Sequence, residues 1–195
     1  MKKNFNLKRE YLEIFAYFKN IQKYIYFIIG VFFIFALIGF FVPSPEIISK
    51  TILEYIENLL EITKDFGFWE MLGYIFLNNL KSSFFGWILG SIFGIFPIWG
   101  SLSNGYVLGF IAAGTVAKNG IPILWRLVPH GIFELPAIFI SLGIGLKLGS
   151  CLFERKKKYV LFRENLIKSI KVFLLIILPL LIIAAIIESF FIFFI

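Results

Sequence analysis

Long apolar stretches recur along this chain of 195 residues, and they restrict its fold more than any other feature. Hydrophobic residues make up 59% of the chain. Charged residues make up only 16%, well below the roughly one quarter that is usual for a soluble domain. Because the apolar residues surround whole helices instead of forming one stripe, these helices must face lipid or be buried on every side. The sequence therefore predicts an all-α fold, a polytopic transmembrane helical bundle with amphipathic interfacial helices.

We expect about five membrane-spanning helices, because a helix needs about 20 apolar residues to cross the hydrocarbon core. The predicted spans cover residues 24–42, 72–99, 101–117, 127–149 and 172–195. All of residues 24–195 are expected to form a single transmembrane helical domain. Gly and Pro interrupt residues 99–126, so this part either crosses the membrane or re-enters it from one side.

Charge is distributed unevenly between the segments that flank the apolar stretches. Residues 1–23 are predicted to form a basic amphipathic helix, residues 46–66 an acidic amphipathic helix, and residues 153–171 a basic segment. Thirteen of the nineteen basic residues lie in the two basic segments: Lys2, Lys3, Lys8, Arg9, Lys19, Lys23, Arg155, Lys156, Lys157, Lys158, Arg163, Lys168 and Lys171. Since positive loops stay in the cytoplasm, we expect a multi-pass plasma-membrane protein with a cytoplasmic N-terminus and an external C-terminus. The expected partner of these basic segments is membrane lipid, not nucleic acid.

The three middle spans carry small residues at every fourth position. These are Gly86, Gly90 and Gly94, then Gly105, Gly109 and Ala113, and then Ser141, Gly145 and Gly149. Lipid supplies little hydrophobic drive between helices, so stripes of small residues that let backbones approach carry much of the association. We expect the second to fourth spans to form a compact core, with the first and last spans around it and one stripe available for a homodimer. The alternative is that glycine is simply common in membrane helices.

Polar residues inside the predicted spans converge at one depth. They are Asn78, Asn79, Lys81, His130, Glu134 and Glu188. His130 and Glu134 lie one turn apart on the same helix face. Because an unpaired charge inside a bilayer costs about 3 kcal/mol or more, we expect Lys81 to pair with Glu134, with His130 and the asparagines completing the hydrogen bonds.

Three interpretations of this polar cluster are open: contacts that hold helices together, a path for a substrate or proton, and a metal or hydrolytic centre. His130 and Glu134 have the spacing of metal ligands, but the sequence has no second histidine and no HExxH or GxSxG motif. The single cysteine, Cys151, excludes an internal disulfide and lacks the spacing of a metal site. We therefore expect no catalytic residue, no metal and no cofactor.

Several of these residues belong to short motifs. The motifs are Phe-Leu-Asn-Asn at 76–79, Gly86 with Gly90, Ser-Asn-Gly-Tyr-Val-Leu-Gly at 103–109, and Pro-His-Gly-Ile-Phe-Glu-Leu-Pro-Ala at 129–137. Together they resemble the stage II sporulation protein M family over roughly residues 10–195, and the Pro-His-Gly-x-x-Glu element is the most specific of them. The family positions that this resemblance carries over are Asn79, Asn104, Gly105, Gly109, His130, Gly131, Glu134 and Ala137. Asn104 and Gly131 are expected to pack helices together, as the glycine stripes are.

The resemblance implies a helical membrane protein of several spans. In spore formers the named member belongs to an engulfment complex, where it anchors cell-wall-degrading partners at the septal membrane. We expect a non-enzymatic membrane scaffold or anchor, with an extracytoplasmic protein as its partner. The alternatives are a membrane transporter or channel for a small solute, ion or lipid, and a membrane-embedded metal-dependent hydrolase.

Overall fold

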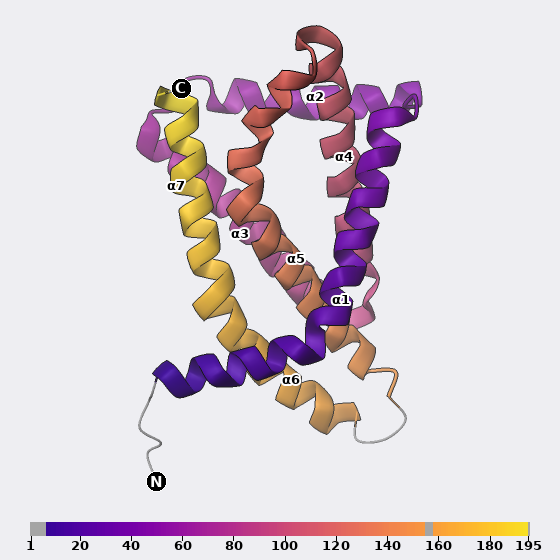
Figure 1. Cartoon of the computed structure of the whole chain (residues 1–195), viewed down its shortest axis with the longest axis vertical. Helices are drawn as coiled ribbons and strands as arrows, with labels where there is room; N and C mark the ends of the chain where they lie inside the picture. The colour runs from indigo at the N-terminus through magenta and orange to yellow at the C-terminus, as the bar shows by residue number, and fades with distance from the viewer. Residues whose placement is uncertain (1–6, 155–157, 195) are drawn as a thin grey trace.

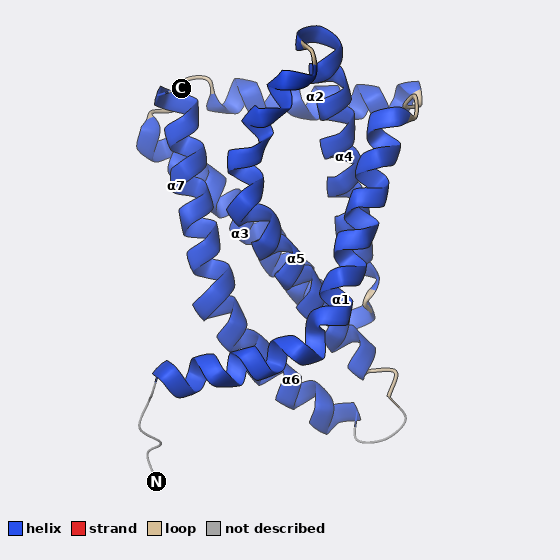
Figure 2. Cartoon of the chain, viewed as in Figure 1, coloured by secondary structure: helices blue, strands red, loops and turns tan. Residues whose placement is uncertain are grey.

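The computed structural model of the protein describes residues 7–154 and 158–194, which form helices joined by short connections, with no strand among them (Figure 2). The side chains at 7–11, 93, 123, 126–130 and 158 lie outside this description, as do residues 1–6 and 155–157 of the two predicted basic segments. The elements are α1 (Leu7–Phe41), α2 (Glu46–Thr63), α3 (Phe68–Phe93), α4 (Ile95–Asn119), the 3-10 helix η1 (Ile121–Leu127), α5 (Val128–Cys151), α6 (Lys158–Val172), the π-helical turn η2 (Phe173–Ile177) and α7 (Leu178–Phe194). The predicted all-α helical bundle is confirmed.

Four stretches of helix in the described residues are long and apolar enough to cross a membrane. They are Leu12–Phe41 in α1, Ile95–Asn119 in α4, Gly131–Cys151 in α5, and Tyr159–Phe194, where α6, η2 and α7 run on from one another. Helix α3, the predicted second span, is not among them. It nevertheless runs the length of the bundle: the Phe68 ring lies 5.9 Å from the Phe193 ring at the end of α7, and the other end of α3 lies beside the end of α5 (Figure 1). The predicted number of five spans stays a prediction.

The boundary between the second and third predicted spans lies at a different residue from the one expected. Helix α3 ends at Phe93 and α4 begins at Ile95, whereas the prediction put this boundary at residues 99–101. Gly94 between them has a φ of 68°, a left-handed conformation that favours glycine and ends a helix. Pro97 lies in the first turn of α4, where its missing N–H group breaks no helical hydrogen bond.

Helix α1 is one continuous but bent helix, so the described part of the helix expected at residues 1–23 and the span expected at 24–42 are two parts of one element. Its first part lies across the base of the bundle, and its second part runs up beside α4 (Figure 1). Ile14, Tyr17 and Ile21 in the first part are buried in one cluster with residues of α3, α5 and η2. The apolar face that was expected to rest on the membrane therefore packs on the bundle.

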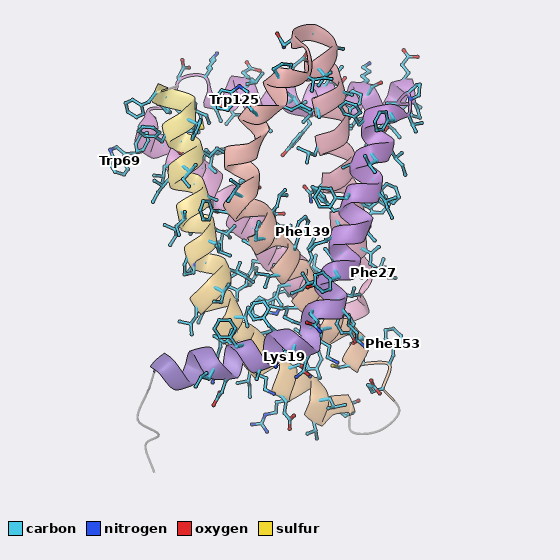
Figure 3. The ribbon with its side chains drawn as sticks, in the orientation of Figure 1. Lys19, Phe27, Trp69, Trp125, Phe139 and Phe153 are labelled. Carbon is cyan, nitrogen blue, oxygen red and sulfur yellow. The ribbon has the colours of Figure 1, made fainter. Side chains whose placement is uncertain are left out.

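The two ends of the bundle differ in character. Helix α2 lies across one end, which is also where α7 finishes, and Trp69 and Trp125 lie at this level (Figures 1 and 3). The first part of α1 and helix α6 lie at the other end, together with Lys19 and Phe153 (Figure 3). The Lys171 ammonium group lies 2.9 Å from the Glu13 carboxylate and joins α6 to α1. These ends are called the α2 end and the α6 end below.

Candidate functional site

Helices α3 and α5 approach so closely that their backbones are in contact along one seam. A Cβ atom added at Gly145 would lie 2.6 Å from the carbonyl oxygen of Gly86. One added at Gly90 would lie 2.8 Å from the Cα atom of Gly145, and one added at Gly149 would lie 2.7 Å from the nitrogen of Gly94. Real Cβ atoms do not occupy such positions, so only glycine fits at these three positions of the seam.

The predicted stripe on α4 packs on α1 instead of on α3 or α5. A Cβ atom at Gly105 would overlap the carbonyl oxygen of Phe32, and one at Gly109 would overlap that of Ala36. We expected α1 to lie outside the core. It instead packs directly against α4 and is part of the core. These glycines are engaged inside the chain, so a homodimer would have to use another surface.

Two other family positions do not pack helices together. Asn104 is exposed, and its side-chain amide donates a hydrogen bond of 2.8 Å to the carbonyl oxygen of Gly100 in its own helix. A Cβ atom at Gly131 would lie 3.3 Å from the side chain of Leu135, which belongs to the same helix.

Three helices bring two carboxyl groups and one amide together in the half of the bundle nearer the α2 end. Glu134 of α5 lies near Glu188 on α7 and near the side chain of Asn79 on α3. Asn79 is only 5% exposed, whereas Asn78 and Lys81 are exposed on other faces of α3. Among the described side chains no ion pair joins Lys81 to Glu134. The structure thus brings together Asn79, Glu134 and Glu188, and it leaves Lys81 and Asn78 apart from them.

The metal interpretation gains no support from the described side chains. No three His, Cys, Asp or Glu residues gather among them as a metal site would require. The side chain of His130 lies outside the described residues, so its expected place beside Glu134 stays a prediction.

Besides the two carboxyl groups, this interface buries polar atoms of α3 and α7. The Asn79 Nδ2, Ser83 Oγ and Ser189 Oγ atoms are buried and have no hydrogen-bond partner in the described part of the chain. The hydroxyl of Ser141 donates a hydrogen bond of 2.5 Å to the Ser83 carbonyl oxygen. Leaving a buried polar atom unpaired costs about 1–3 kcal/mol, so this interface is suited to a small polar guest such as water or an ion. Sequence reasoning missed Ser83 and Ser189; the signal for Ser83 is its position one turn after Asn79.

Helix α2 presents its acidic face outward at its end of the bundle. Its acidic residues Glu46, Glu54, Glu57 and Glu61 are exposed. Ile52 on the opposite face is buried, and Lys50 lies 3.8 Å from Glu54 in a solvent-exposed pair. A shallow groove of about 430 Å³ on this helix is lined partly by Glu46, Glu54 and Glu57. The acidic amphipathic helix predicted at residues 46–66 is present, ending at Thr63.

Comparison with known proteins relates nearly the whole bundle to one family. The sequence model described as stage II sporulation protein M matches residues 28–191, from the second part of α1 into α7. An uncharacterized protein of Methanocaldococcus jannaschii is 31% identical over 157 residues, which make up 78% of this chain and 69% of that protein. No solved structure matches the chain. The chain therefore belongs to the stage II sporulation protein M family.

Proposed function

We propose that this protein is a non-enzymatic membrane scaffold that presents the acidic face of α2 to a basic extracytoplasmic protein partner. The observation that carries the proposal is the exposure of Glu46, Glu54, Glu57 and Glu61 on a helix whose opposite face is buried at Ile52. Charges exposed at the rim of an interface attract partners of opposite charge and determine the orientation in which they dock.

The proposed orientation puts the α2 end outside the cell and the α6 end in the cytoplasm, with the chain in the plasma membrane. Arg163, Lys168 and Lys171 lie on α6, and positive charge beside a span favours the cytoplasmic side. The acidic face of α2 then meets proteins of the cell exterior.

Rigid packing between helices also favours a scaffold. One glycine seam joins α1 to α4 and another joins α3 to α5, and in both seams the atoms in contact belong largely to the backbone. Backbones in such close contact cannot slide past one another without a large loss of packing. A bundle built in this way is a rigid base, and α2 lies across one end of it (Figure 1).

Replacing the three central glutamates by glutamine, E54Q with E57Q and E61Q, is expected to weaken partner binding about tenfold, since each exposed charge pair contributes up to about 1 kcal/mol. A photo-crosslinking amino acid at Asn58 would measure this in the membranes of the source cells, and the adducts would be identified by mass spectrometry. Raising the salt concentration should also reduce the adduct. The same crosslinker at Tyr159 on α6 is the control. An unchanged adduct in the triple variant would exclude charge-directed docking on α2.

A second candidate function is a path for a small cation, and the polar interface of α3, α5 and α7 favours it. Glu134 and Glu188 lie near each other there, and the Asn79 Nδ2 atom is buried with no hydrogen-bond partner among the described residues. Neighbouring carboxylates in a medium of low dielectric attract a positive charge. A proton or a sodium ion would supply that charge.

Ion flux into proteoliposomes separates this candidate from the scaffold. If the path exists, liposomes with the wild-type protein should take up protons or sodium ions at least about tenfold faster than E134Q liposomes, because the substitution removes a charge from the site. Lys81→Gln on α3 is the matched control, since Lys81 is exposed and apart from Glu134. If wild-type liposomes are no more permeable than empty ones, the ion path is rejected and the scaffold is unaffected.

A further inference from the structure

A cavity of about 720 Å³ lies at the bend of α1. It lies at the edge of the buried cluster that contains Ile14, Tyr17 and Ile21, since its lining residues Phe18, Ile25 and Ile140 pack against that cluster. Figure 3 shows Lys19 on this part of α1, near the point where the helix turns from the base into the bundle. The volume lies within the roughly 300–1,000 Å³ that is usual for small-molecule sites.

One part of the cavity wall is apolar. Phe15, Phe18 and Ile25 contribute to it from α1, and Ile140 contributes from the middle of α5. Phe15 and Tyr26 at this site are each 68% exposed. Large apolar side chains left uncovered on a membrane helix face the hydrocarbon of the bilayer, so the cavity opens to lipid.

Another part of the wall is polar and carries a positive charge. Lys19, Asn20 and Gln22 line the cavity, and all three are exposed. A lysine at the edge of the bilayer lays its alkyl chain along apolar surface and extends its ammonium group to the headgroup level. The two amides beside it offer N–H donors to an anion.

Other cations mark this level of the bundle as the headgroup region. The ammonium groups of Lys23 and Lys147 lie 5.1 and 5.4 Å from the centre of the Tyr24 ring, just beyond the bend. Helix α6 at the same end carries the exposed residues Arg163 and Lys168. Clusters of basic residues next to a span favour anionic phospholipids.

We propose that the cavity at the bend of α1 binds one anionic phospholipid molecule. An acyl chain lies against Phe15, Phe18 and Ile140, and the phosphate accepts hydrogen bonds from Lys19 with Asn20 and Gln22 beside it. The combination of an apolar wall open to hydrocarbon and a cation at headgroup level fits a lipid better than a soluble anion. The site is at the α6 end, so it does not depend on docking at α2.

Native mass spectrometry of the full-length protein in detergent tests the proposal, with phosphatidylglycerol and phosphatidylcholine of identical acyl chains as probes. The wild-type protein should retain one phosphatidylglycerol with a clear preference over phosphatidylcholine. Lys19→Gln should lower the affinity for phosphatidylglycerol about fivefold and leave that for phosphatidylcholine unchanged, because it removes one lysine from the headgroup level. Lys118→Gln, at an exposed lysine in the last turn of α4, is the matched control and should leave the preference as it is.

A second variant tests the apolar wall. Ala16 lines the cavity and is exposed, so A16W fills the space without disturbing the buried face of α1. It should weaken the binding of both lipids. Equal affinities of wild type and Lys19→Gln for phosphatidylglycerol would overturn the proposal, and so would its displacement by millimolar inorganic phosphate, which would indicate a site for a soluble anion.

Photolabelling of the unmodified protein in nanodiscs gives an independent result. A phosphatidylglycerol with a diazirine on its acyl chain should label peptides that contain residues 15–26 and Ile140 above all others. Labelling spread evenly over the exposed faces of α1, α4 and α7 would indicate ordinary bilayer contact and would refute a specific site.

Discussion

Gly145→Ala is expected to destabilise the protein by about 1–3 kcal/mol, the usual loss when an atom is forced into a filled core. The added Cβ atom would lie 2.6 Å from the Gly86 carbonyl oxygen and 3.1 Å from that of Trp87. Both oxygens belong to the backbone of α3, so the clash can be relieved only by moving the helix. Unfolding in detergent with increasing dodecyl sulfate, followed by circular dichroism, measures the loss.

Two other alanine substitutions separate this packing effect from the change of residue type. Gly86→Ala on the same seam meets first the Cδ2 atom of the Leu142 side chain, 2.5 Å away, and a flexible side chain can rotate aside. Gly73→Ala on α3 meets no atom within 4 Å. We expect the loss of stability to be greatest for Gly145→Ala, smaller for Gly86→Ala, and zero or a gain for Gly73→Ala. Equal effects at all three positions would show that close backbone approach does not stabilise the seam.

The residues that build the helices could be predicted from the sequence because their signal is local. Apolar stretches of sufficient length mark the spans, and the separation of acidic from apolar residues marks α2. The end of α3 could not be placed in this way. Pro97 and Gly100 favour a break near residue 99, but the left-handed conformation that ends the helix occurs at Gly94, one of several glycines nearby.

Composition changes at the bend of α1, from basic and amphipathic to wholly apolar, and this change alone predicts two separate segments. The buried residues do not change at that point. Ile14, Tyr17, Ile21 and Ile28 are separated by three, four and seven residues and follow one helical stripe through the bend. A helix whose buried stripe continues in phase has no reason to end.

The depth of a residue in the membrane does not determine which side of its helix it occupies, and the polar site shows this. Counting residues along the helices predicted that Lys81 and Glu134 lie at one depth, but it gave no direction around the helix axis. Residues that are two positions apart in an α-helix point in directions about 200° apart, so Asn79 and Lys81 cannot both face α5. Asn79 is buried at the interface and Lys81 is exposed, and the ionisable side chain that lies near Glu134 is that of Glu188. The packing of α7 against α3 and α5, which determines that contact, is a long-range property that no local pattern contains.

Gly109→Ala is expected to separate α1 from α4 and to cost about 1–3 kcal/mol as well. The new Cβ atom would overlap the carbonyl oxygen of Ala36 and lie 2.9 Å from the nitrogen of Phe40. Glycine is needed on both sides of this seam, since a Cβ atom at Gly39 of α1 would overlap the carbonyl oxygen of Tyr106 on α4. Dodecyl sulfate titration again gives the loss, and disulfide trapping of cysteines placed on α1 and α4 reports the separation.

Gly114→Ala is the matched control, because it makes the same chemical change on the same helix at a position with no atom within 4 Å. Both substitutions remove a glycine from a helix interior, which alone favours the helix by about 0.5–1 kcal/mol. The difference between them therefore isolates the contact with α1. The α1–α4 and α3–α5 seams share no residue, so the losses from Gly109→Ala and Gly145→Ala should add within about 0.5 kcal/mol. A combined loss much smaller than the sum would mean that breaking one seam already releases the other, and that the bundle is held as one cooperative unit instead of two separately packed pairs.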